Sequence, residues 1–219
     1  MIRPAAGIQR VIGEVYSWAA DKLYQPVIVE GAFPLFGGDL DRFVTAQGRR
    51  AVESARGRPI LDAPVGTAHF TVRTASVHTG MVVGTDLADG MVREARRIAV
   101  AAGVEGLVLV RSDIHALPFK RNAFGAILCT NGLQVIPGLE PAVRELARVL
   151  APGARLYLSV ITVPLGLLFP PEVAGRLPTL LKSKREIIDA LVGAGLSVTS
   201  VTTQRLATFI EALKPALSS

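Results

Sequence analysis

Short apolar segments that end in an aspartate alternate with helical segments through the middle of this 219-residue chain. The acids that close the first three segments are Asp62, Asp86 and Asp113. Strands that are apolar throughout and separated by helices are typical of a parallel sheet covered on both faces. Because parallel strands end at the same edge of a sheet, the pattern predicts three carboxylates side by side where open α/β folds bind ligands.

The remaining elements extend this α/β pattern. Strands are expected at residues 59–62, 81–86, 107–113, 124–130 and 155–161, with helices at 88–102, 139–150 and 183–192. Ser183 and Glu186 form the capping-box pattern that opens the last helix. Segments 197–203 and 206–213 are joined by so short a connection that they must pair antiparallel. The sequence therefore predicts a mostly parallel sheet that finishes in an antiparallel hairpin.

The first part of the chain has helical rather than strand periodicity. Apolar residues recur at helical spacing over 8–19 and again after Asp39, a plausible N-cap. These helices each have an apolar face to bury and no place in the sheet, so we expect the helices of 8–56 to pack over its carboxyl edge. We thus divide one compact domain into an N-terminal helical cap, residues 1–58, and a core, residues 59–219.

Composition narrows the class of partner. Half of the residues are hydrophobic and 19% are charged, which suits a sizeable core and excludes a disordered chain. The net charge is +6, but the basic residues are scattered, which does not favour nucleic acid as a partner. The single cysteine, Cys129, excludes an internal disulfide and favours a reducing, cytoplasmic compartment. The longest uncharged run, residues 156–171, is too short to span a membrane and leaves only peripheral membrane contact open.

The turn after the first strand suggests the class of ligand. Gly66 would let the backbone approach a ligand closely. Asp86 stands twenty residues later, the spacing at which an acid reaches ribose hydroxyls. The two residues together indicate a ligand that contains a nucleoside.

Five segments in order resemble the motifs of class I S-adenosylmethionine-dependent methyltransferases, in particular the small-molecule branch of the ubiquinone and menaquinone methyltransferases. These segments are residues 60–68, 83–96, 112–119, 143–153 and 209–215. The resemblance covers residues 10–215 and implies a Rossmann-like, seven-stranded sheet with helices on both faces. It also implies methyl transfer from S-adenosylmethionine to a small acceptor, with S-adenosylhomocysteine as the product and no metal.

The resemblance implies a role for each residue that matches a motif. Asp62 would order the amino group of the methionine moiety, Asp86 would accept both ribose hydroxyls and Asp113 would accept from the adenine amino group. The other cofactor contacts that it implies are Ala63, Pro64, Gly66, Leu87, Met91, Ile114, Cys129 and Thr130.

Several residues depart from the usual motifs. Pro64 and Ala68 replace two of the three glycines usual in the first motif. Gly125 stands where an aspartate commonly follows phenylalanine, and Gln134 stands where histidine is frequent. These departures bear on affinity and acceptor chemistry more than on the fold.

Few residues are suited to act as a catalytic base. Methyl transfer from a sulfonium depends largely on positioning, and a base helps when the acceptor is a hydroxyl or an acidic carbon. The candidates are Tyr16 on the first helix and His115 beside the adenine segment. We expect Cys129 to be a small buried residue rather than a nucleophile.

The sequence says least about the substrate that accepts the methyl group. The apolar segment 162–171 follows the fifth strand and begins at the cofactor's edge. It either packs under the N-terminal helices or lines a pocket for a lipid-, quinone- or polyketide-like molecule. The methylated atom and the oligomeric state, a homodimer included, stay open.

Three other functions compete with this interpretation. A methyltransferase-fold protein could bind the cofactor without methylating. A nicotinamide oxidoreductase would need a fuller glycine-rich turn than Gly66 alone provides. A methyltransferase of nucleic-acid amino groups would carry Asn/Asp-Pro-Pro-aromatic where Cys129-Thr-Asn-Gly132 stands.

Overall fold

The structure, a computed structural model, describes residues 40–161, 182–205 and 207–216. The helices are α3 (Leu40–Ala55), α4 (Thr71–Ala75), α5 (Asp89–Ala101), α6 (Leu139–Val149) and α8 (Lys184–Gly193), together with the 3₁₀ turn η2 (Leu133–Val135). The strands are β1 (Ile60–Asp62), β2 (Val82–Asp86), β3 (Leu107–Arg111), β4 (Phe124–Thr130), β5 (Leu150–Ile161), β6 (Ser197–Gln204) and β7 (Ala207–Leu213). None of the helices in these ranges is long and apolar enough to cross a membrane.

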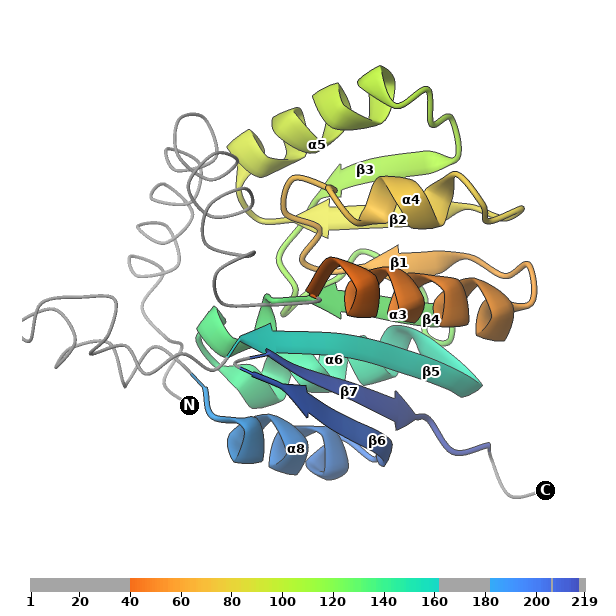
Figure 1. Cartoon of the computed structure of the whole chain (residues 1–219). Helices are drawn as coiled ribbons and strands as arrows, with labels where there is room; N and C mark the ends of the chain where they lie inside the picture. Colours follow the sequence, from red (N-terminus) through yellow and green to blue (C-terminus); the bar gives the residue numbers. More distant parts are fainter. Residues whose placement is uncertain (1–39, 162–181, 206, 217–219) are drawn as a thin grey trace, which may run out of the picture.

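The seven described strands form a single sheet in the order β3-β2-β1-β4-β5-β7-β6 (Figure 1). Strands β1 to β5 run parallel, and β7 pairs antiparallel with both β5 and β6. The predicted mostly parallel sheet with its antiparallel C-terminal hairpin is confirmed. The strand order reverses between β1 and β4, which is where open α/β sheets bind their ligands.

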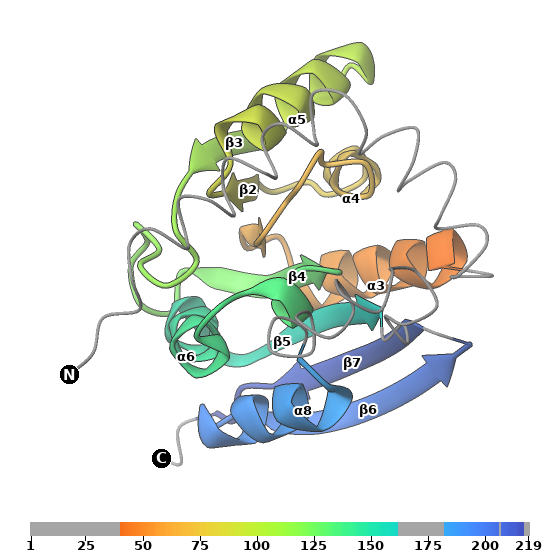
Figure 2. The same cartoon turned by 90° about the vertical axis from the view of Figure 1, so that its left-hand side faces the viewer.

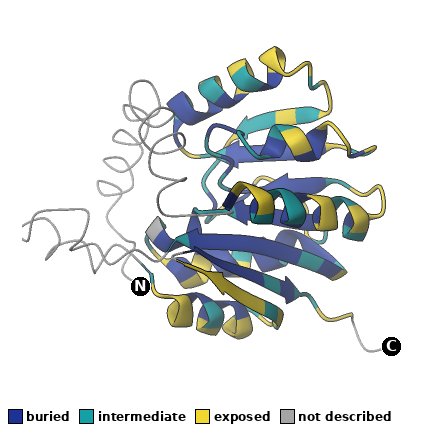
Figure 3. Cartoon of the chain, in the orientation of Figure 1, coloured by how far each residue is buried: buried dark blue, intermediate teal, exposed yellow. Residues whose placement is uncertain are grey.

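Helices cover both faces of the sheet. Helices α3, α4 and α5 lie on one face, and α6 and α8 lie on the other (Figure 2). In α6, Leu139, Val143 and Leu146 recur at helical spacing, and all are buried against the sheet. Figure 3 shows the central strands mostly buried, whereas the edge strand β6 is mostly exposed. The core therefore consists of two apolar layers with the sheet between them.

Local sequence signals locate the C-terminal elements well. Ser183 Oγ accepts from the Glu186 N–H at 3.2 Å, and the Ser183 N–H donates to Glu186 Oε2 at 2.8 Å. This is the predicted capping box of α8. The hairpin of β6 and β7 also forms as predicted.

Two strand boundaries differ from expectation by more than one residue. Strand β3 ends at Arg111 rather than at Asp113, because the Asp113 carboxylate accepts from the His115 N–H and starts a turn. Strand β5 begins at Leu150 rather than at residue 155, because Leu150 already pairs with Phe124 across an irregularity in register.

The expectation that the helices of 8–56 cover the carboxyl edge was wrong for α3. This helix packs on the face of the sheet, where Gln47 Nε2 donates to the Leu158 carbonyl at 3.1 Å and Ala51 and Ala55 join the core. Its apolar stripe is buried by strands rather than by a ligand pocket. Residues 1–39, with the candidate Tyr16, lie outside the described residues, and the division at residue 58 stays a prediction.

The close packing of α3 explains why glycine occupies position 125. A Cβ added to Gly125 would lie 2.8 Å from the Ala55 carbonyl oxygen and 2.7 Å from Arg58 Cβ. The end of α3 and the Arg58 side chain therefore take the space that an aspartate side chain would need at this position.

We expect Gly125→Ala to lower the free energy of unfolding by about 1–3 kcal/mol, because the new methyl group overpacks this contact. The matched control is Gly193→Ala, since a Cβ at the end of α8 meets nothing within 4 Å. Alanine in a helix is favoured over glycine by up to about 1 kcal/mol, so this control should be neutral or stabilising. Urea denaturation of both variants measures the difference, and equal effects would contradict the packing argument.

Candidate cofactor site

The loop after β1 is held at the point where the strand order reverses. The Ala63 N–H donates to the Leu128 carbonyl at 3.0 Å, and the Val65 N–H donates to the Thr85 carbonyl at 2.7 Å. The Gly66 N–H donates to Asp86 Oδ2 at 3.0 Å. The loop thus spans the carboxyl ends of β4, β1 and β2, and Gly66 adopts the left-handed conformation (φ 53°).

The departures at positions 64 and 68 are accommodated in this loop. Pro64 follows a cis peptide bond, and a Cβ at Gly132 would lie 2.3 Å from Pro64 Cγ. The glycine after β4 therefore leaves the space that the proline ring fills. Ala68 is left-handed (φ 60°), as a glycine would be, and its methyl group packs with Val65 and Ala95.

Asp62 is a buried carboxylate with half of its hydrogen-bonding capacity unused. Thr71 Oγ1 on α4 donates to Asp62 Oδ2 at 2.5 Å, while Asp62 Oδ1 is buried without a partner. Burial raises the pKa of Asp62 to about 7, against the opposing effect of the Thr71 hydrogen bond, and the nearby charge of Asp86 adds to the rise. A positively charged donor at Oδ1 would restore the ionised form.

The Asp86 carboxylate accepts hydrogen bonds from two backbone segments, the loop after β1 and the turn before α5. Its Oδ2 accepts from Gly66 and its Oδ1 accepts from the Ala88 N–H at 2.9 Å. Burial raises the pKa of Asp86, and these backbone hydrogen bonds partly offset that rise. The carboxylate is thereby fixed at the end of β2, next to the loop of the first motif.

Asp113 and His115 form a third polar group beyond β3. Asp113 Oδ1 accepts from the His115 N–H at 2.9 Å and lies 2.6 Å from His115 Nδ1. His115 Nε2 lies 2.7 Å from the Pro137 carbonyl. Both ring nitrogens thus face acceptors inside the protein, so this geometry does not support His115 as a base for an acceptor substrate.

The other predicted contacts differ in exposure. Met91 and Ile114 are buried, Leu87 is partly exposed at the end of β2, and Thr130 is half-buried at the end of β4. Cys129 is fully buried, and burial, with a smaller effect of the Asp62 charge, raises the pKa of its thiol. A thiol in that environment is a poor nucleophile. The structure therefore supports the expectation that Cys129 has a packing role.

Four buried side-chain atoms among the described residues lack a hydrogen-bond partner, and all four belong to residues at or shortly after the carboxyl ends of β1, β3 and β4. They are Asp62 Oδ1, Ser112 Oγ, Asn131 Nδ2 and Gln134 Oε1. Unsatisfied polar atoms are rare in protein interiors, so their concentration at one edge indicates a ligand site. Ser112, Asn131 and Gln134 were not predicted as site residues, although the positions of Ser112 and Asn131 directly after β3 and β4 were a usable signal.

No cluster suited to a metal ion is present among residues 40–161, 182–205 and 207–216. The groups that the edge offers are carboxylate oxygens and amides at separate strand ends. These suit the hydrogen-bonding groups of an organic ligand.

Solved structures of other proteins share this fold. The [4+2]-cyclase SpnF superposes with a TM-score of 0.68 at 20% identity, over 80% of this chain and 82% of that chain. An S-adenosylmethionine-dependent methyltransferase from Aquifex aeolicus superposes with a TM-score of 0.66 at 19% identity, over 80% and 92% of the two chains. At these identities the likeness shows the fold alone, which is the Rossmann-like fold of class I methyltransferases.

Sequence similarity to known proteins covers about half of the chain. Residues 60–153 match a family model described as a methyltransferase domain. The ubiquinone/menaquinone biosynthesis C-methyltransferase UbiE of Enterobacter sp. (strain 638) is 35% identical over 113 residues, which cover 50% of this chain and 45% of that protein. The chain thus matches about half the length of these curated relatives. Residues 60–153 thus resemble a methyltransferase domain and lie on a sheet with the fold of class I methyltransferases.

Proposed function

We propose that the chain transfers a methyl group from S-adenosylmethionine to a small apolar acceptor. The observation that carries the proposal is the unpartnered Oδ1 of Asp62, a buried acceptor at the end of β1. The ammonium group of the methionine moiety is a donor of the right charge for this atom. The residues of this edge therefore fit the cofactor of the family.

The order of the acids along the sheet also matches the order of donors along the cofactor. Asp62 and Asp86 end the neighbouring strands β1 and β2, and Asp113 lies two residues after the end of β3. The methionine ammonium, the ribose hydroxyls and the adenine amino group succeed one another in S-adenosylmethionine in the same order. Each acid would then accept from one part of the molecule.

The chemistry needs little from the side chains beyond positioning. When bound, S-adenosylmethionine supplies a methyl carbon that the acceptor's lone pair attacks, while the C–S bond breaks and its electron pair stays on sulfur. The loop of residues 63–68 and the end of β4 orient the sulfonium side. Because both nitrogens of His115 are engaged, the described residues favour an acceptor that ionises readily or that needs no strong base.

Two observations support an apolar acceptor. Segment 162–171 is apolar and follows Ile161, the last residue of β5 at the carboxyl edge. The relative UbiE carries a name that assigns it to ubiquinone and menaquinone biosynthesis, which is quinone chemistry. We infer a phenol, quinone, polyketide or fatty-acid-like acceptor of low or negative charge.

A screen of such compounds with a methyl-labelled donor tests this function. Labelled product is expected from at least one apolar phenol, quinone or fatty acid, together with S-adenosylhomocysteine in equal amount. Turnover confined to nucleic acids or to highly polar metabolites would contradict the apolar pocket.

A second candidate function is cofactor binding without methylation, as in a cyclisation or another non-transfer role. It is favoured by the likeness to SpnF, a protein of this fold that is named as a [4+2]-cyclase. Calorimetry with S-adenosylhomocysteine, run beside the screen, separates the two. Tight binding without any labelled product would favour this second function, and absence of binding would contradict both.

A further inference from the structure

A basic cavity lies at the opposite end of the sheet from the cofactor edge. It has a volume of about 810 Å³ and lies between the end of α3, the turn before β1, the start of β5 and the end of β7. In Figure 1 these elements meet at the right-hand side, away from the carboxyl edge on the left. Strand β4 connects the two ends, with Gly125 at the cavity and Thr130 at the cofactor edge, about 16 Å apart at the usual strand rise.

Arginines dominate the charge of this cavity. Its charged lining residues are Arg50, Arg56, Arg58, Arg155, Glu53 and Glu211. Four arginines against two glutamates leave a net charge of +2 on the lining. Lys214 directly follows the end of β7, and Arg121 acts on it electrostatically, so positive charge extends beyond the cavity itself.

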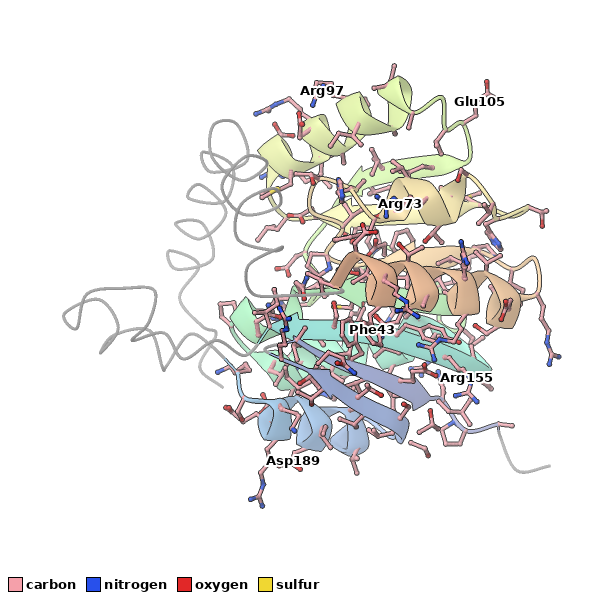
Figure 4. The ribbon with its side chains drawn as sticks, viewed as in Figure 1. Phe43, Arg73, Arg97, Glu105, Arg155 and Asp189 are labelled. Atoms are coloured by element: carbon pink, nitrogen blue, oxygen red, sulfur yellow. The ribbon has the colours of Figure 1, made fainter. Side chains whose placement is uncertain are left out.

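The guanidinium groups retain donors that a ligand can use. Arg58 Nη2 donates to the Asn122 carbonyl at 2.8 Å, and Arg155 Nη1 donates to Thr199 Oγ1 at 3.0 Å. Each guanidinium has five N–H donors, so these contacts position the groups without exhausting them. Figure 4 shows Arg155 projecting near the start of β5.

Arg50 forms an ion pair with a carboxylate, and a more highly charged anion in the cavity would compete with that carboxylate for the guanidinium group. Its Nη1 lies 2.6 Å from Glu211 Oε1, and the Glu211 side chain is only 13% exposed. The buried Tyr157 donates from its hydroxyl to the Arg50 carbonyl at 3.2 Å and so fixes the backbone beneath the pair. Glu211 therefore competes with any anion that enters the cavity.

We propose that this cavity is a second binding site, for a small molecule or headgroup that bears phosphate or pyrophosphate. Planar guanidinium groups match phosphate oxygens in pairs, and four arginines, of which Arg50 lies on α3 and Arg155 on β5, suit a multiply charged anion. A cavity of this volume is within the range that holds a whole small ligand rather than a single ion. The site is independent of the methyl donor, which carries no phosphate.

Calorimetry of the full chain with inorganic pyrophosphate tests the site, and sedimentation with phosphatidylcholine vesicles, with and without phosphatidic acid, tests the lipid source. We expect saturable binding of pyrophosphate that weakens about fivefold to tenfold in Arg56→Gln and in Arg155→Gln. Arg96→Gln, an exposed residue of α5, is the matched control for net charge and should stay within about twofold. Binding only to the phosphatidic-acid vesicles, lost in Arg56→Gln, would assign the site to a headgroup.

Glu211→Gln gives a result that misfolding cannot imitate. Removal of the competing carboxylate should tighten pyrophosphate binding about threefold or more, because Arg50 no longer has an anionic partner. The proposal is overturned if the wild type binds neither probe saturably. It is also overturned if Arg96→Gln weakens binding as much as Arg56→Gln, which would indicate general attraction to a basic surface.

Discussion

Replacing Asp62 with asparagine is expected to stabilise the unliganded protein at pH 8 and to weaken its binding of S-adenosylhomocysteine. Burial raises the pKa of Asp62 to about 7 from its ordinary value of 3.8, so the folded state holds a proton more tightly than the unfolded chain. Stability contributed by such a group falls as the pH rises from about 4 to about 7 and stays low above that. Asparagine removes this charge and keeps an acceptor for Thr71.

The expected gain in the free energy of unfolding for Asp62→Asn is about 1–3 kcal/mol at pH 8, and it should vanish near pH 4. The new amide N–H groups lack partners, which keeps the gain below the full effect of the pKa shift. Urea denaturation at both pH values measures it. Asp189→Asn, at an exposed position on α8, is the control and should change stability by less than about 0.5 kcal/mol at either pH.

The same substitution tests the site. We expect Asp62→Asn to bind S-adenosylhomocysteine about 10–100-fold more weakly at pH 8, because a charge-assisted hydrogen bond to the ammonium is lost. Wild-type affinity should rise between pH 6 and pH 8 as Asp62 gives up its proton, whereas the variant's affinity should not follow this titration. A variant that is less stable at pH 8, or one that binds as tightly as the wild type, contradicts the assigned role.

Replacing Asp86 should have the larger effect on affinity. Its carboxylate fixes Gly66 and Ala88 through their N–H groups and is expected to accept the ribose hydroxyls as well. Asp86→Ala removes all of these hydrogen bonds, so we expect S-adenosylhomocysteine to bind at least about 100-fold more weakly. Asp89→Ala, three residues further along in α5, removes the same charge from an exposed pair with Arg93 and should change affinity less than about threefold.

Two ligands that differ in one ribose hydroxyl separate the contact of Asp86 with the ribose from its hydrogen bonds to the protein backbone. Wild-type protein should prefer adenosine over 3′-deoxyadenosine, and Asp86→Asn should lose most of that preference even if its loop is intact. Calorimetry on the four combinations measures the coupling. An undiminished affinity of Asp86→Ala for S-adenosylhomocysteine would refute the assignment.

The sequence by itself determined the sheet and the acids at its edge. Strand and helix periodicity are local properties, and each of Asp62, Asp86 and Asp113 closes its own apolar segment, so their common edge follows from parallel pairing alone. The capping box of α8 and the terminal hairpin were equally readable, because their signals lie within a few residues.

Only the tertiary structure determined the packing, burial and charge partners of these residues. The amphipathic pattern of α3 would be the same whether the helix covered a ligand or a sheet. The close approach of Ala55 to Gly125 on β4 shows that the apolar side of α3 packs on the sheet. The raised pKa of Asp62 depends on its burial within the folded core, which the neighbouring sequence does not predict. The basic cavity joins Arg50 to Arg155 and Glu211 through packing of distant segments. Periodicity fixes which side of an element is apolar, but burial, charge pairing and cavities arise only when separate elements meet.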